Sequence, residues 1–156
     1  MWHGGGRFDA TVEARLQAAC RRLGMDATPI RLPGGTPEKE FAAVLGNSGV
    51  EAADILWNTA SLTATHLEQL VRLGIASSFA AGPRPVHDGG LLCYVHVGTG
   101  EILLGLVARI LHGERVADIP AQQPREFHFA INLRTARALG ITVPASMLVR
   151  AHDVFE

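Results

Sequence analysis

Aromatic and polar side chains gather at the ends of three short segments that have the apolar character of strands. These residues are Trp57, Asn58, Thr59, Phe79, Tyr94 and His96. Aromatic walls with a few amide, hydroxyl and imidazole groups suit non-covalent binding of a small polar or aromatic molecule. The same residues also have a structural interpretation, with Trp57 and Phe79 in the core and Asn58 with Thr59 capping the next helix.

Residue types for covalent or metal chemistry are present, but they lack the spacing that such chemistry needs. None of the seven histidines forms H-x-x-x-H or H-E-x-x-H, and no cysteine pair has zinc spacing. No serine lies in a G-x-S-x-G elbow. Cys93 lies in an apolar run without a cation to activate it, so we expect Cys93 and Cys20 to be small buried residues, with a disulfide between them left open. We therefore expect no catalysis, no metal and no cofactor.

The elements that must position these side chains alternate between helix and strand. Helical spacing of apolar residues, with Gly or Pro at the boundaries, predicts helices over residues 8–23, 37–45, about 61–73, about 100–112 and 133–139. Thr36 is the predicted N-cap of the second helix and Asn132 that of the last. Short apolar runs predict strands over residues 25–32, 53–58, 75–79, 91–97 and 126–131.

This alternation with short links predicts an α/β fold, a three-layer sandwich with a mostly parallel sheet. Ligand sites in such sheets lie beyond the carboxyl ends of the strands, where the candidate residues gather. The chain of 156 residues, with 47% hydrophobic and 19% charged residues, is long enough for one domain with a core. Its net charge of −1 and scattered arginines argue against a nucleic-acid partner.

Neither a membrane span nor a signal peptide is predicted from the sequence. There is no run of about 18 apolar residues. The start, MWHGGGRFDA, lacks the basic and apolar regions of a signal peptide. We therefore expect a cytosolic protein, a mature form, or a piece of a longer chain.

A series of short motifs fills the last third of the chain. They are Gly89–Gly90, Tyr94, Ile110–Leu111 with Gly113, Ala117 to Pro120, Gln123–Pro124, Asn132 to Gly140, Pro144 to Leu148 and Ala151 to Val154. This series resembles the C-terminal end of ABC-transporter substrate-binding proteins of the tryptophan/tyrosine type, and a weaker match upstream keeps the same order. Where that family tends to have Ser–Tyr–Gly, this chain has Cys93–Tyr94–Val95.

The resemblance implies a type I periplasmic-binding-protein fold, of which residues 1–156 would be a single α/β lobe, the C-terminal one. The family's first lobe and signal peptide would then be absent. It further implies a periplasmic location, or a cytoplasmic one if this is the natural start, and non-covalent binding of a small molecule such as an amino acid for an ABC permease. The surface left by a missing lobe predicts a homodimer.

The sequence is also compatible with three other functions. A lobe of this architecture also occurs in ligand-sensing regulatory domains. A small α/β enzyme could use His96 or Cys93, and a truncated gene could leave a remnant without ligand binding. A neighbouring permease and ATPase would favour transport, whereas a fused DNA-binding or signalling domain would favour sensing.

Overall fold

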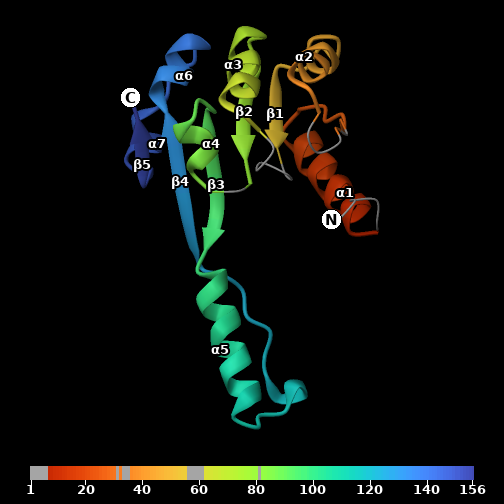
Figure 1. Cartoon of the computed structure of the whole chain (residues 1–156), viewed down its shortest axis with the longest axis vertical. Coiled ribbons are helices and arrows are strands. Elements are labelled where there is room, and N and C mark those ends of the chain that lie inside the picture. The colour runs from red at the N-terminus through yellow and green to blue at the C-terminus, as the bar shows by residue number, and fades with distance from the viewer. Residues whose placement is uncertain (1–6, 31, 33–35, 56–61, 81) are drawn as a thin grey trace. The chain divides into compact units, whose positions relative to one another are not determined.

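The computed structural model describes residues 7–30, 32, 36–55, 62–80 and 82–156, and it divides into two compact units, Met1–Pro33 and Gly34–Glu156 (Figure 1). The first unit contains helix α1 (Arg7–Arg22), and the amide of Met25 donates to the carbonyl of Cys20 at its end. Residues 25–30 form no strand, so the strand predicted over 25–32 is wrong there. A strand exists only where a neighbour supplies hydrogen-bond partners, and all five strands of the sheet lie in the second unit.

The second unit is built on one sheet whose spatial order follows the sequence. Its strands are β1 (Ala52–Ile55), β2 (Ala76–Phe79), β3 (Leu92–Val97), β4 (Glu126–Asn132) and β5 (Asp153–Phe155). Three of the four strand pairs are parallel, and only β3 and β4 run antiparallel. The prediction of an α/β fold with a mostly parallel sheet is confirmed.

Helices follow the strands much as the periodicity predicts. They are α2 (Glu38–Gly46), α3 (Ala64–Arg72), α4 (Arg84–His87), α5 (Thr99–Leu111), the 3-10 turn η2 (Val116–Asp118), α6 (Leu133–Ala138) and α7 (Ala145–Leu148). Two predicted helix starts need correction. The N-cap of α2 is Pro37 and not Thr36, and α3 begins after Thr63 rather than near residue 61. Residues 56–61 lie outside the described part of the chain.

A buried histidine joins the starts of α2 and α3. The amide of Thr63 donates to Nδ1 of His66 over 3.2 Å, so Nε2 carries the proton and donates to the Thr36 carbonyl over 3.2 Å. The His66 ring also meets the edge of Phe41 at 4.9 Å. One imidazole therefore caps α3 and holds the segment before α2 at the same time.

A glycine pair shapes the turn between α4 and β3. Gly89 has a φ of +126°, which side chains rarely allow. A Cβ atom on Gly90 would lie 2.2 Å from the ring of Phe79 and 2.9 Å from the Pro85 carbonyl oxygen. The turn can therefore pack against the core only if both positions lack a side chain.

Asn132 fastens the same turn to α6 from the other side. Its side chain is fully buried, accepts from the Thr135 amide over 3.0 Å and donates to the Val86 carbonyl over 2.8 Å. The Thr135 hydroxyl in turn donates to the Gly89 carbonyl over 2.9 Å. The N-cap predicted at Asn132 is confirmed, and the structure adds the long-range bond to Val86.

Candidate functional site

The carboxyl ends of β1 and β2 lie side by side, since Ile55 and Phe79 are the last register pair of these strands. Trp57, Asn58 and Thr59 lie outside the described residues, so their part in a site stays a prediction. Phe79 is 1% exposed and its ring lies against Gly90. Phe79 is therefore a core residue, as in the structural interpretation of the sequence. A contact between Phe79 and a ligand also stays a prediction.

Tyr94 and His96 share one face of β3, and both are exposed. The Tyr94 ring is 53% exposed and stacks on Phe127, with 5.0 Å between centroids and 6° between planes. It also meets the edge of Phe129 at 6.3 Å. The antiparallel register pairs Tyr94 with Phe129 and His96 with Phe127, which places all four side chains on one face of the sheet.

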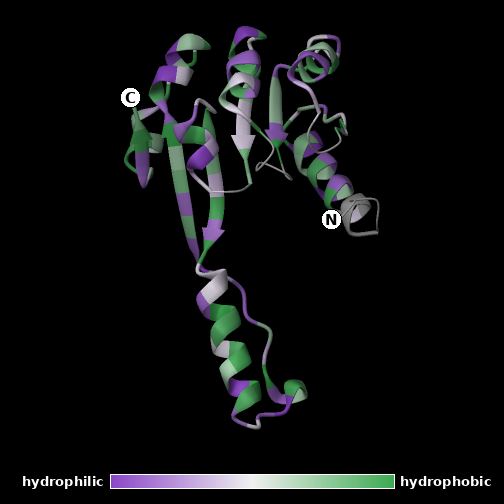
Figure 2. Cartoon of the chain, in the orientation of Figure 1, coloured by the Kyte–Doolittle hydropathy of each residue, from purple (hydrophilic) through white to green (hydrophobic). Residues whose placement is uncertain are grey.

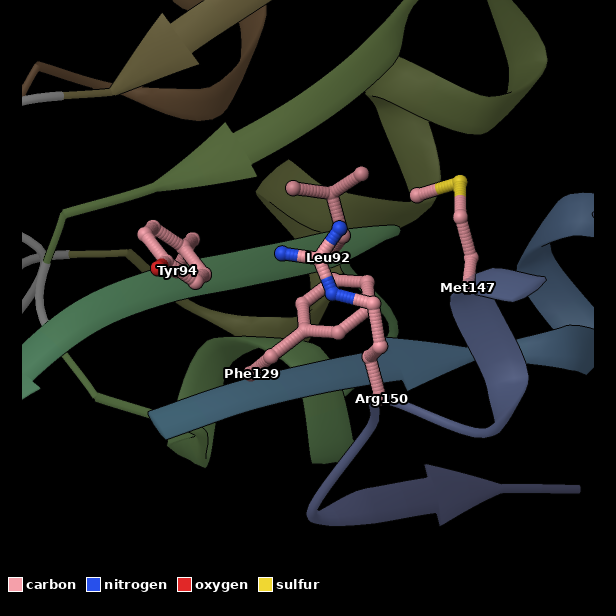
Figure 3. Close-up of a pocket in the computed structure, with 5 residues that line it drawn as sticks. All are labelled: Leu92, Tyr94, Phe129, Met147 and Arg150. Atoms are coloured by element: carbon pink, nitrogen blue, oxygen red, sulfur yellow. The ribbon is translucent and has the colours of Figure 1, made fainter. Parts of the chain in front are cut away.

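This face borders a hollow of about 400 Å³ (Figure 3). The residues that line it are Leu92, Tyr94, Phe129, Met147 and Arg150. Figure 3 shows the side chains of Met147 and Arg150 reaching from α7 and the turn after it towards β3 and β4. Within the described part of the chain, no carboxylate forms an ion pair with Arg150. The hollow thus combines apolar and aromatic surface with the guanidinium group of Arg150, which forms no ion pair with an acidic side chain of the described residues.

The sequence prediction missed Phe127, Phe129, Met147 and Arg150. A signal for the phenylalanines was present, because alternation in the run EFHFAI places residues 127, 129 and 131 on one face. Their meeting with Tyr94 required the antiparallel register of β3 and β4, which the alternation does not give. No local pattern places Arg150 beside them.

Cys93 is fully buried on the opposite face of β3, and burial raises the pKa of its thiol. Both cysteines are free, so the disulfide left open by the sequence is not formed. Among the residues that the structure describes, no three His, Cys, Asp or Glu side chains converge as metal ligands.

A second group of titratable side chains fastens β5 to β4. Nε2 of His128 lies 2.8 Å from a carboxylate oxygen of Asp153, and the His128 and His152 rings stack at 5.1 Å. The Phe129 amide donates to Nδ1 of His152 over 3.1 Å, and the His152 amide donates to the Phe129 carbonyl over 2.7 Å. These bonds hold the C-terminal strand in register next to the aromatic face.

Comparison with known proteins decides the family. The model of the ABC transporter substrate binding protein family matches residues 55–155, which include the aromatic face, the hollow and α5. The chain belongs to this family. No curated protein is similar enough in sequence to count as a relative.

Solved structures place this family member in the fold of periplasmic binding proteins. A conserved domain protein from Vibrio cholerae is 20% identical with a TM-score of 0.79, over 98% of this chain and 52% of its own. An ABC domain from Streptococcus pneumonia, solved in complex with L-Trp, is 22% identical with a TM-score of 0.74, over 99% of this chain and 54% of its own.

A third similar structure is a ligand-free, open substrate binding protein with adhesive properties from Clostridium difficile. It is 18% identical with a TM-score of 0.66, over 99% of this chain and 52% of its own. The chain therefore spans about half the length of each of the three. Among its described helices, none has the length and apolar character that crossing a bilayer demands.

Proposed function

We propose that residues 1–156 act as a single α/β lobe, the C-terminal lobe of a substrate-binding protein that holds a small solute for an ABC permease without transforming it. The observation that carries this proposal is the family match over residues 55–155. It is supported by the low reactivity expected of the buried Cys93 thiol. Proteins of this family work outside the inner membrane, so we propose a periplasmic location.

The ligand class that suits the exposed face is a small amino-acid-like molecule with a planar apolar part. A ring could lie against Tyr94 and Phe129, because aromatic pairs favour stacked and edge-on contacts. A carboxylate could pair with Arg150, whose guanidinium presents two parallel donors. The L-Trp bound to the pneumococcal structure is a molecule of this class. His96 and the predicted residues Trp57, Asn58, Thr59 and Phe79 complete the proposed set.

One lobe covers only one side of such a ligand. Ligand sites in proteins usually bury most of the ligand surface, and Tyr94 is still half exposed here. We therefore expect the lone chain to bind L-Trp or L-Tyr with a dissociation constant no tighter than about 1 mM, or about −4 kcal/mol. Isothermal titration at concentrations where light scattering shows a monomer measures this, and micromolar binding would overturn the half-site argument.

A second copy of the chain is also part of the proposal. Large exposed apolar side chains are common in the second unit, and surfaces of this kind are interfaces more often than free solvent-facing patches. We propose that two copies share this surface as a homodimer. The genes next to this one distinguish transport from sensing. A neighbouring permease and ATPase support transport, whereas a fused signalling domain supports sensing.

A further inference from the structure

Strand β4 has two different faces, and His152 is bonded to it between them. Figure 2 shows bands of both hydrophobic and hydrophilic colour along β4. Phe129 lines the hollow, whereas His128 lies on the other face of the strand. His152 bonds to the backbone of Phe129, and its ring stacks on that of His128. His152 therefore connects a residue of the hollow to a second titratable group.

Two hydrogen bonds join His152 to Phe129. The His152 amide donates to the Phe129 carbonyl over 2.7 Å, and the Phe129 amide donates to Nδ1 of the His152 ring over 3.1 Å. A ring nitrogen accepts a hydrogen bond only while it carries no proton of its own. The second bond therefore exists only when the imidazole is neutral, with its proton on Nε2.

The segment before His152 carries Arg150, whose side chain lines the hollow (Figure 3). The Arg150 amide donates to the Met147 carbonyl over 3.1 Å, which holds this segment on the side of α7. On the side of the sheet, the pairing of β5 with β4 begins with Asp153 opposite Ala130. His152 precedes that pairing and lies two positions from Arg150. Its bonds to Phe129 therefore fix the end of the segment that carries the guanidinium group.

The two stacked imidazoles respond differently to a proton. Nε2 of His128 lies 2.8 Å from the Asp153 carboxylate and donates to it, so a proton added at Nδ1 of His128 breaks no bond in this cluster. A proton added at Nδ1 of His152 removes the acceptor of the Phe129 amide. Once both rings are charged, they repel each other across the 5.1 Å between their centroids. His152 is exposed, so water can deliver the proton without unfolding.

Other ionisable groups on the surrounding elements were compared with Asp153. Among the described residues, Asp153 is the acid within ion-pair distance of these two rings, and His87 of α4 is paired with Asp88 over 2.9 Å. The remaining ionisable side chains are Glu126 on β4, Cys93 on β3, Glu156 after β5, Arg84 on α4, and Arg134 and Arg137 on α6, with Tyr94 and His96 on the opposite face of β3. The geometry therefore makes His128 and Asp153 the neighbours that act most directly on His152.

We propose that His152 is a positioning residue of the hollow, and that a proton on its ring weakens the site. The neutral ring holds the Phe129 backbone and the segment that carries Arg150. Imidazole is the side chain that changes its charge between about pH 5 and 8, so the bond is present at neutral pH and is lost as the pH falls. The effect on a ligand rests on the proposed function, but the change at Phe129 and Arg150 takes place in the ligand-free chain as well.

NMR of the labelled, ligand-free chain tests the positioning. Between about pH 7.5 and 5, we expect the Phe129 amide to lose protection against hydrogen exchange while the Arg150 side-chain signal shifts. His152→Asn keeps an acceptor oxygen near the place of Nδ1 but does not titrate, so the protection of Phe129 is expected to persist. His152→Ala is expected to lack it already at neutral pH. The control His112→Asn, at a ring bonded to the Ala108 carbonyl, is expected to respond like the wild type.

The neighbouring charge is tested with His128→Gln, which keeps a donor for Asp153 but no longer titrates. We expect the loss of Phe129 protection to move to higher pH in this variant, because the proton on His152 then meets no charged ring beside it. The same midpoint in His128→Gln and the wild type would show that the stacked pair is not coupled, and would overturn the assigned role of His128.

The affinity for L-Trp tests the effect on the site. For the wild type, we expect the dissociation constant to rise about fivefold between about pH 7.5 and 5, the factor that one hydrogen bond typically supplies. In His152→Asn we expect a change below about twofold, and this variant also controls for any change in the ligand itself.

The inference is overturned if Phe129 keeps its protection in acid, or if the wild type and His152→Asn lose it equally. An affinity that falls equally in these two proteins overturns it as well. If L-Trp binds at neither pH, the proposed function has failed, whereas the ligand-free measurements at Phe129 and Arg150 still decide the role of His152.

Discussion

The turn around Gly89 and helix α5 both lie within the family match, but only the first is completed by the chain itself. At the turn, each polar group of the Asn132 side chain has a partner, and the core ring of Phe79 fills the space that Gly90 leaves. In α5, no residue is buried and its large apolar side chains are exposed in the described structure. The contrast distinguishes residues that stabilise the fold of this unit from exposed apolar residues that have no packing partner in the described structure.

The largest expected difference between the two regions comes from replacing one glycine by alanine in each. Gly90→Ala is expected to lower the free energy of unfolding by about 3 kcal/mol, because the new Cβ collides with Phe79 and the Pro85 backbone. Gly105→Ala in α5, where nothing lies within 4 Å, is expected to raise it by about 0.5–1 kcal/mol. Urea denaturation measures both, and equal effects would contradict the contrast between the regions.

The polar side of the turn is tested with an asparagine pair. Asn132→Ala removes the cap of α6 and leaves the Val86 carbonyl without its donor, so we expect a loss of about 2–3 kcal/mol of unfolding free energy. Asn47→Ala, at an exposed position after α2, is expected to change it by less than about 0.5 kcal/mol. Thermal denaturation compares the two variants. Similar losses would show that the two hydrogen bonds of the Asn132 side chain do not stabilise the turn.

A smaller effect is expected at the end of α5. Arg109 donates to the carboxylate of Glu114 and holds the pKa of that acid below its usual range. A lowered carboxyl pKa adds stability above the unfolded pKa, near 4, and this contribution is lost as the pH falls through the folded pKa. The last turn of α5 should therefore loosen in acid.

Amide exchange or NMR shifts of residues 108–114 follow this change. In Glu114→Gln the same residues are expected to respond less between about pH 5 and 3, since no carboxylate is left to titrate. An identical acid response in both proteins would show that the ion pair does not hold the turn.

Local patterns predict most of this fold, and the misses have a common cause. Asn132 as a cap and the alternation of strands with helices follow from contacts within a few residues, so the sequence carries them. The composition of residues 25–32 predicts a strand, but a strand forms only where a neighbouring strand supplies hydrogen-bond partners. Thr36 and Pro37 are both acceptable helix starts, and the choice between them depends on packing.

The candidate site was harder to predict for the same reason. The strand pattern predicts Tyr94 as a site residue, and Tyr94 does lie exposed beside the hollow. Phe129 and Arg150 join it only through the β3–β4 register and the turn after α7, which are far apart in the sequence. Phe79 has a similar sequence context to Tyr94 but is buried, because Gly90 lets the chain close over it.

The central claim is that the aromatic face beside Arg150 holds a small amino-acid-like molecule without changing it. Titration of the isotope-labelled chain with L-Trp, followed by NMR, tests this most directly. The account predicts shifts concentrated at Tyr94, Phe129 and Arg150, weaker shifts in Tyr94→Ala, and L-Trp recovered unchanged. Shifts confined to other residues, or a chemically altered ligand, would contradict it.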